Sequence, residues 1–132
     1  MDGRWEWLYL SADLASRTRF YQDGDREVVG SIRCGILFLM AFWSGTSRRA
    51  FEELKRVLKA VDPDGRLELV VVDVDGDPEL YNFPEFAGKL GGNGEAAWIR
   101  DGRIMQTSVG FRPECFEGHT RELLKQCEAP ES

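Results

Sequence analysis

Residues 36–47 read Ile36-Leu37-Phe38-Leu39-Met40-Ala41-Phe42-Trp43-Ser44-Gly45-Thr46-Ser47. The run from Ile36 to Phe42 is apolar without a polar interruption, which is typical of a strand covered on both faces. We therefore expect this strand at the centre of a sheet that has helices on either side. Ser44, Thr46 and Ser47 are each suited to cap a following helix, because a hydroxyl oxygen accepts hydrogen bonds from the free N–H groups at a helix start.

A helix and a second strand follow this stretch. The helix is predicted because Phe51, Leu54, Val57, Leu58 and Val61 recur at the spacing of one helix face. A turn at residues 62–65 ends it, and the apolar, β-branched run 67–74 is the second strand. Strand, helix and strand in this order indicate an α/β domain.

The last third of the chain predicts a hairpin and a helix. Residues 95–100 and 103–109 flank Asp101-Gly102, a dipeptide that favours a tight hairpin turn. Pro113 then opens a helix that runs to about Cys127. Between the second strand and the hairpin, residues 77–90 are predicted to be a loop and a helix interrupted by a proline.

The N-terminal third is less regular. We expect a short aromatic-rich strand at residues 5–10, a turn at 22–25 and a short helix around 26–32. There is no internal repeat and no linker long enough to separate two domains. We therefore treat residues 1–132 as a single domain, with 1–34 as an N-terminal extension and 35–127 as its core.

Length and charge narrow the classes of function. The chain has 132 residues, with 17 Lys and Arg against 23 Asp and Glu, and a formal net charge of −6 at pH 7. This length supports a core that needs no disulfide or metal. The excess of acid argues against nucleic acid and anionic membranes as partners, because both attract cationic surfaces. The longest apolar run is far shorter than the ~20 residues that span a bilayer.

The three cysteines are Cys34, Cys115 and Cys127. They are few and scattered, which favours a reducing compartment over a secreted disulfide framework, and we expect a cytoplasmic protein. No two of them have the spacing of a CxxC motif. Cys115 and Cys127 share one predicted helix, where they would lie about 18 Å apart, too far for a disulfide.

Three segments resemble the thioredoxin family. Residues 38–47 resemble the family's strand that ends in Trp-Cys-Gly-Pro-Cys at the start of its long helix. Residues 73–75 resemble the end of the next strand, and residues 99–110 resemble the hairpin and the Val-Gly before the final helix. The resemblance covers about residues 35–127. It implies a thioredoxin-like fold with a central mixed sheet flanked by helices.

The sequence departs from this family where the family's chemistry lies. Ser44 and Ser47 replace the two motif cysteines, and Thr46 replaces the proline between them. The family's buried acid corresponds to Phe38, and its cis-proline corresponds to Gly94. Disulfide exchange requires an attacking thiolate and a second thiol, and serine provides neither. We therefore expect no catalytic residue and no CxxC oxidoreductase activity.

The family's substrate groove remains as a candidate binding site. It consists of Trp43, Ser44, Gly45, Thr46, Ser47, Asn93 and Gly94. The leading interpretation is a redox-inactive module that binds proteins or acts as a chaperone through this groove, with no cofactor. The alternative is an enzyme that binds glutathione or a small anion at Ser44, helped by the helix dipole and by Arg48 and Arg49. A third interpretation is an oligomeric role for residues 5–10.

Three further candidate sites have weaker support. Cys115 and His119 are four residues apart on one predicted helix, which is half of a zinc site, but no second pair of ligands is visible. The alternating acids from Asp73 resemble the start of a calcium loop, but prolines occupy its sixth and twelfth positions. Ser44 has no histidine nearby in sequence to activate it as a nucleophile. We expect no metal.

Overall fold

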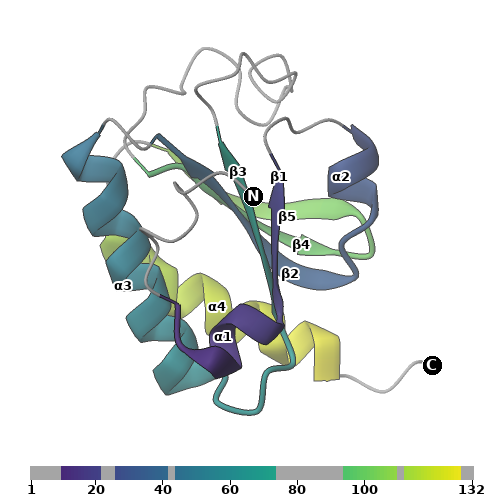
Figure 1. Ribbon diagram of the computed structural model, residues 1–132. Coiled ribbons are helices and arrows are strands. Elements are labelled where there is room, and N and C mark those ends of the chain that lie inside the picture. Colours follow the sequence, from purple (N-terminus) through teal and green to yellow (C-terminus); the bar gives the residue numbers. More distant parts are fainter. Residues whose placement is uncertain (1–9, 22–25, 42–43, 74–93, 110–111, 129–132) are drawn as a thin grey trace.

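The computed structural model describes residues 10–21, 26–41, 44–73, 94–109 and 112–128. Figure 1 shows helices packed around one central sheet. The helical elements are α1 (Ala12–Ser16), α2 (Arg26–Gly30), α3 (Gly45–Val61), the 3-10 turn η5 (Pro113–Cys115) and α4 (Phe116–Glu128). The strands are β1 (Thr18–Tyr21), β2 (Cys34–Met40), β3 (Glu68–Asp73), β4 (Ala96–Arg100) and β5 (Arg103–Ser108).

The sheet is mixed, as predicted. Its strand order is β1-β3-β2-β4-β5, in which β3 pairs in parallel with β1 and β2, and β4 pairs antiparallel with β2 and β5. The strand predicted from the unbroken apolar run is β2, and it lies in the middle. Every residue of β2 after Cys34 is buried. The central position follows from that apolar pattern, because each face of β2 contacts a hydrophobic layer.

Alternate residues of β2 divide the core into two layers. Ile36, Phe38 and Met40 face a layer that includes residues of α3 and α4, whereas Leu37 and Leu39 face a layer that includes residues next to and within α2. Figure 1 shows the same arrangement, with α3 and α4 on one side of the sheet and α2 on the other. The two hydrophobic layers of the core therefore pack against opposite faces of one strand, β2.

The hairpin and the last helix agree with the sequence prediction. Asp101 and Gly102 both have positive φ, 51° and 76°, which the tightest two-residue hairpin turn requires. The last helix begins as η5, with Pro113 in its first turn, and continues as α4. No helix in the described part of the chain is both long and apolar enough to span a membrane.

The N-terminal third differs in part from the prediction. Strand β1 was not predicted, because its four residues have no clear apolar alternation, and it exists by pairing with β3. Helix α2 matches the predicted short helix. The strand expected at 5–10, the turn at 22–25 and the loop and helix at 77–90 fall on residues 1–9, 22–25 and 74–93, outside the described residues apart from Leu10, which lies in no strand.

Candidate functional site

The turn between β2 and α3 places Ser44 at the first capping position of the helix. Its backbone is extended, and its Oγ accepts a hydrogen bond from the Ser47 N–H at 3.2 Å. The Ser44 N–H donates to the Ala41 carbonyl at 3.0 Å, which fixes the turn to the end of β2. Only 8% of Ser44 is exposed. The capping role predicted for this residue is therefore confirmed, and its hydroxyl oxygen is committed to the helix.

Ser47 connects α3 to the end of β2. It is completely buried, and its Oγ accepts a hydrogen bond from the Ala41 N–H at 3.1 Å. The same hydroxyl donates to Met40 Sδ at 3.6 Å. The hydroxyl thus accepts one hydrogen bond and donates one within the protein. Ser47 occupies the second cysteine position of the family motif, and here its hydroxyl connects α3 to β2.

Gly94 lies directly against the start of α3, as the resemblance implied. A Cβ built on Gly94 would be 2.3 Å from Ala50 Cβ, 3.6 Å from Ser47 Cα and 3.6 Å from the tip of the Phe38 ring. Gly94 has a φ of +86°, and no cis peptide bond occurs in the described ranges. The structure therefore brings together Ser47, Gly94 and Phe38, with glycine and an aromatic ring where the family has cis-proline and a carboxylic acid.

A shallow surface recess opens at the start of α3. It has a volume of about 430 Å³ and is lined by Gly45, Thr46, Arg48, Arg49 and Glu52. Arg48 and Arg49 are exposed, and Arg48 Nη2 lies 3.8 Å from the point where a Cβ on Gly45 would be. We call these five residues the α3 recess. Trp43 and Asn93, which complete the groove in the sequence prediction, lie outside the described residues.

The fold of these elements is that of known thioredoxins. Mitochondrial thioredoxin 3 from Saccharomyces cerevisiae matches with a TM-score of 0.62 at 18% identity, covering 84% of this chain and 99% of that protein. The chain has a thioredoxin-like fold. Desulfothioredoxin from Desulfovibrio vulgaris Hildenborough matches with a TM-score of 0.60 at 16% identity, and the match covers 89% of this chain and 99% of desulfothioredoxin.

A third match is thioredoxin from Plasmodium falciparum, with a TM-score of 0.59 at 13% identity over 79% of this chain and 97% of that one. No family model and no curated protein matches the sequence. The likeness is thus one of structure, and it covers nearly the whole length of each thioredoxin. The thioredoxin-like fold predicted from the sequence is confirmed.

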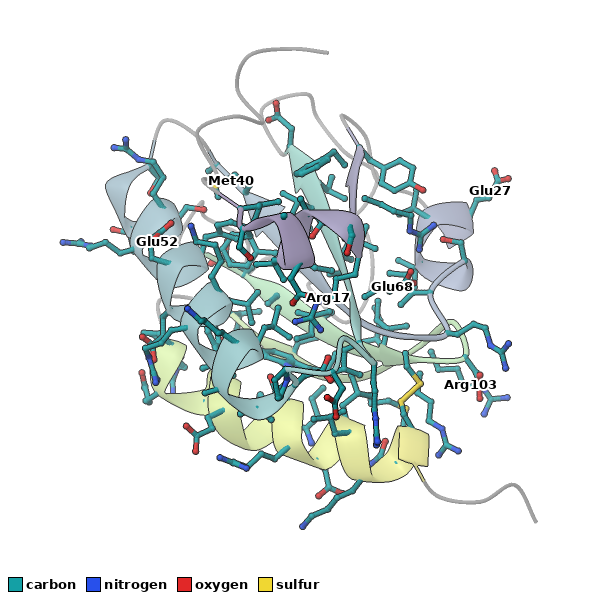
Figure 2. The ribbon with its side chains drawn as sticks, turned by 60° about the horizontal axis from the view of Figure 1, so that its bottom comes forward. Arg17, Glu27, Met40, Glu52, Glu68 and Arg103 are labelled. Atoms are coloured by element: carbon teal, nitrogen blue, oxygen red, sulfur yellow. A yellow bond between two sulfur atoms is a disulfide. The ribbon has the colours of Figure 1, made fainter. Side chains whose placement is uncertain are left out.

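The sequence reasoning missed a disulfide at the other end of β2. Cys34, the first residue of β2, is bonded to Cys127 in the last turn of α4, with the two Cα atoms 6.3 Å apart. Figure 2 shows this bond in yellow beside the end of α4. The sequence separation of 93 gives the pair no local signal, since it has neither CxxC spacing nor a shared helix. Cys115 is free.

His119 is a packing residue of α4 within this fold. Its ring meets the Trp98 ring edge-on at 4.8 Å, and burial lowers the pKa of the imidazole below its ordinary value. The Trp98 indole N–H donates to Thr120 Oγ1 at 3.0 Å, which fixes the indole against α4. The described residues contain no group of three or more side chains able to hold a metal ion.

Proposed function

We propose that this thioredoxin-like domain binds other proteins, as a partner or chaperone-like module, and does not exchange disulfides at the turn between β2 and α3. The observation that carries the proposal is the use of the two serines. Ser44 Oγ caps α3, and the Ser47 hydroxyl joins α3 to β2 while completely buried. Neither side chain offers a thiolate, and the Ser47 hydroxyl is completely buried, away from a substrate.

The α3 recess supplies the contact surface in this proposal. It lies at the start of α3, where the backbone N–H groups and the helix dipole favour negative charge. Arg48 and Arg49 add positive charge to an otherwise acidic protein. We therefore propose that the partner is a polypeptide segment that places a carboxylate in this recess. Trp43 and Asn93 remain part of the proposed groove on the strength of the sequence.

A site-specific crosslinking experiment tests this function. A photoreactive phenylalanine analogue at Thr46 should crosslink a partner in cells, whereas the same analogue at Lys59, an exposed residue near the far end of α3, should not. Charge reversal with Arg48→Glu and Arg49→Glu, or Trp43→Glu, should abolish the crosslink. A folded Lys59→Glu variant is the matched control. Equal crosslinking from both positions, or no loss with the reversed charges, would refute the proposal.

Binding of glutathione or another small anion is the second candidate. The position of the Arg48 guanidinium beside Gly45 favours it, since a cation and a helix start together bind carboxylates. Calorimetry with millimolar glutathione should then give saturable heat that Arg48→Gln weakens. Saturable binding without a protein crosslink would favour this candidate, and no heat for wild type would eliminate it.

A cytoplasmic location is also part of the proposal. It rests on the composition, and the Cys34–Cys127 disulfide allows a direct test, because disulfides are rare in the cytosol. Acid quenching of living cells followed by alkylation should find the two cysteines mainly as thiols. A fully oxidised pair in growing cells would contradict a cytoplasmic location.

A further inference from the structure

The Cys34–Cys127 disulfide lies at the end of β2 opposite to the motif turn, so it is separate from the proposed groove. Each cysteine is partly buried and packs against the edge of the hydrophobic core, and neither is among its fully buried residues. We infer that this pair is a reversible exchange site for low-molecular-weight thiols such as glutathione. In this site Cys127 is the sulfur attacked, and Cys34 leaves as the thiolate.

The two sulfurs have different electrostatic surroundings. In the antiparallel pairing of β2 with β4, Cys34 is directly opposite Arg100. Directly opposed residues point to the same face of a sheet, so the Arg100 guanidinium and the Cys34 sulfur share one face. Arg100 is 37% exposed and has Asp101 as a distant partner, with Nε and Oδ2 3.9 Å apart. A nearby cation stabilises a thiolate, which favours Cys34.

A second cation, Arg103, lies on the face of Cys34, because it is directly opposite Arg100 in the pairing of β4 with β5, whereas Glu68 and Arg19 lie on the other face. Side chains alternate along a strand, so the Gly35 position lies on the opposite face from Cys34. Glu68 belongs to that opposite face, because its Cγ is 2.6 Å from the place of a Gly35 Cβ, and Arg19 pairs with Glu68 at 2.8 Å. On the face of Cys34, the layer around it is formed by apolar residues of β2, β3 and α4. Arg100 is thus the charge that β4 presents to Cys34.

Cys127 is in the less favourable position for a thiolate. It occupies the last turn of α4, where unpaired carbonyl groups give the helix end a partial negative charge. Lys125 is exposed on the same turn, and Glu128 follows Cys127 directly in the sequence. The helix end therefore raises the free energy of a Cys127 thiolate, whereas Arg100 lowers that of Cys34. The bond should break so that Cys34 carries the negative charge.

The exchange balances as two thiol–disulfide steps. A glutathione thiolate attacks Cys127 Sγ, the Cys34–Cys127 bond breaks, and Cys34 leaves as a thiolate. A second glutathione thiolate then attacks the glutathione sulfur of the mixed disulfide on Cys127, forming oxidised glutathione and releasing the Cys127 thiolate. One protein disulfide is reduced and two glutathione molecules are oxidised, and the reverse sequence restores the bond.

Exchange with defined glutathione mixtures tests the inference. The experiment uses the Cys115→Ser variant, so that only Cys34 and Cys127 can react. Circular dichroism during the exchange checks that the variant stays folded. Native protein in reduced glutathione should lose the bond, and alkylation should then trap two thiols. Oxidised glutathione should restore the bond. The mixed disulfide trapped early in reduction should map to Cys127 by peptide mass.

Arg100→Gln and Arg33→Gln form a matched pair of variants. Each removes one positive charge close to Cys34, but Arg100 is the residue directly opposite Cys34 in the sheet, whereas Arg33 precedes β2. Arg100→Gln should slow reduction about threefold, because loss of the cation makes Cys34 a poorer leaving group. Arg33→Gln should reduce at the rate of the parent protein. In the reduced protein, iodoacetamide should label Cys34 faster than Cys127 below neutral pH, where the thiolate fraction limits the rate.

Three results would overturn the inference. The first is a bond that glutathione reduces only after denaturation, which would make the disulfide purely structural. The second is a mixed disulfide that maps to Cys34. The third is an equal effect of Arg100→Gln and Arg33→Gln. Because both arginines are at least partly exposed, these variants test the chemistry without a large change in stability.

Discussion

Gly94 and Ala50 are in such close contact that no side chain fits between them. A Cβ on residue 94 would lie 2.3 Å from Ala50 Cβ, and the φ of +86° at Gly94 is itself unfavourable for any residue with a side chain. This contact presses the segment before β4 against the start of α3. It therefore fixes the distance between the two sides of the candidate groove.

Gly94→Ala should destabilise the protein by about 3 kcal/mol, because the methyl group combines a clash with a strained backbone. Urea unfolding followed by circular dichroism measures the change. Gly118→Ala is the matched control, since a Cβ there meets nothing within 4 Å and lies in α4. The control should gain up to about 1 kcal/mol. Similar effects of the two substitutions would show that the close contact is wrong.

Ser47→Ala should cost about 1–3 kcal/mol, because it leaves the buried Ala41 N–H without an acceptor. Ser44→Ala should cost about 1 kcal/mol, the typical value for a lost helix cap. Thr46→Ala, between them, should change stability by less than about 0.5 kcal/mol. Thermal unfolding of the three variants measures this order. A larger loss for Thr46→Ala than for Ser47→Ala would contradict the roles given to the serines.

Asp62 ends α3 and binds three groups at once. Its carboxylate accepts from Arg17 Nη1 at 2.5 Å and from the backbone N–H groups of Arg66 and Leu67. Arg17, labelled in Figure 2, is only 10% exposed at its side chain, and Asp62 is 2% exposed. The pair therefore ties the end of α1 to the loop before β3, away from solvent.

Asp62→Asn should destabilise the protein by about 3 kcal/mol, since it leaves the Arg17 charge buried without its counter-charge. Asp64→Asn is the control, because Asp64 is exposed two residues further on. Chemical denaturation of both variants gives the comparison. Should Asp62→Asn unfold at the same denaturant concentration as Asp64→Asn, the buried ion pair contributes nothing to stability.

The sequence predicts the parts of this fold in which burial sets the pattern. The central position of β2 followed from its apolar run, and the hairpin turn followed from Asp101-Gly102. Strand β1 was missed because its four half-buried residues have no strong pattern, and the pairing with β3 decides its conformation. The local sequence of β1 carries no information about its pairing with β3.

The candidate site was likewise predicted only in part, because tertiary packing decides the rest. The capping role of Ser44 is local and could be predicted, and the facing position of Gly94 followed from the family resemblance. The bond from Ser47 to the end of β2 and the Cys34–Cys127 disulfide join residues through tertiary packing. Cysteines at the start of one element and the end of another become a pair only when the packing of α4 on β2 is known.

Removal of the disulfide by Cys34→Ser with Cys127→Ser should lower the stability by about 4 kcal/mol. The bond closes a loop across a sequence separation of 93 residues, and in the chain-entropy account a loop of that length strongly restricts the unfolded state. Cys115→Ser should have little effect, because Cys115 is free. Unfolding of wild type with and without reductant provides a second measurement. If reductant lowers the stability much less than the double substitution does, then the loss in the variant comes from altered packing and not from the missing bond.

His119 should make the protein less stable below neutral pH. Burial lowers the pKa of His119 in the folded state, so the unfolded state binds the proton more readily. The stability contributed by the neutral imidazole is therefore complete above the ordinary histidine pKa of about 6.5 and decreases as the pH falls toward the lower folded value. His119→Gln keeps a polar group beside Trp98 but cannot titrate. Melting temperatures between pH 7 and pH 5 should fall more steeply for wild type than for this variant, and parallel pH profiles would assign the acid sensitivity to the carboxylates instead.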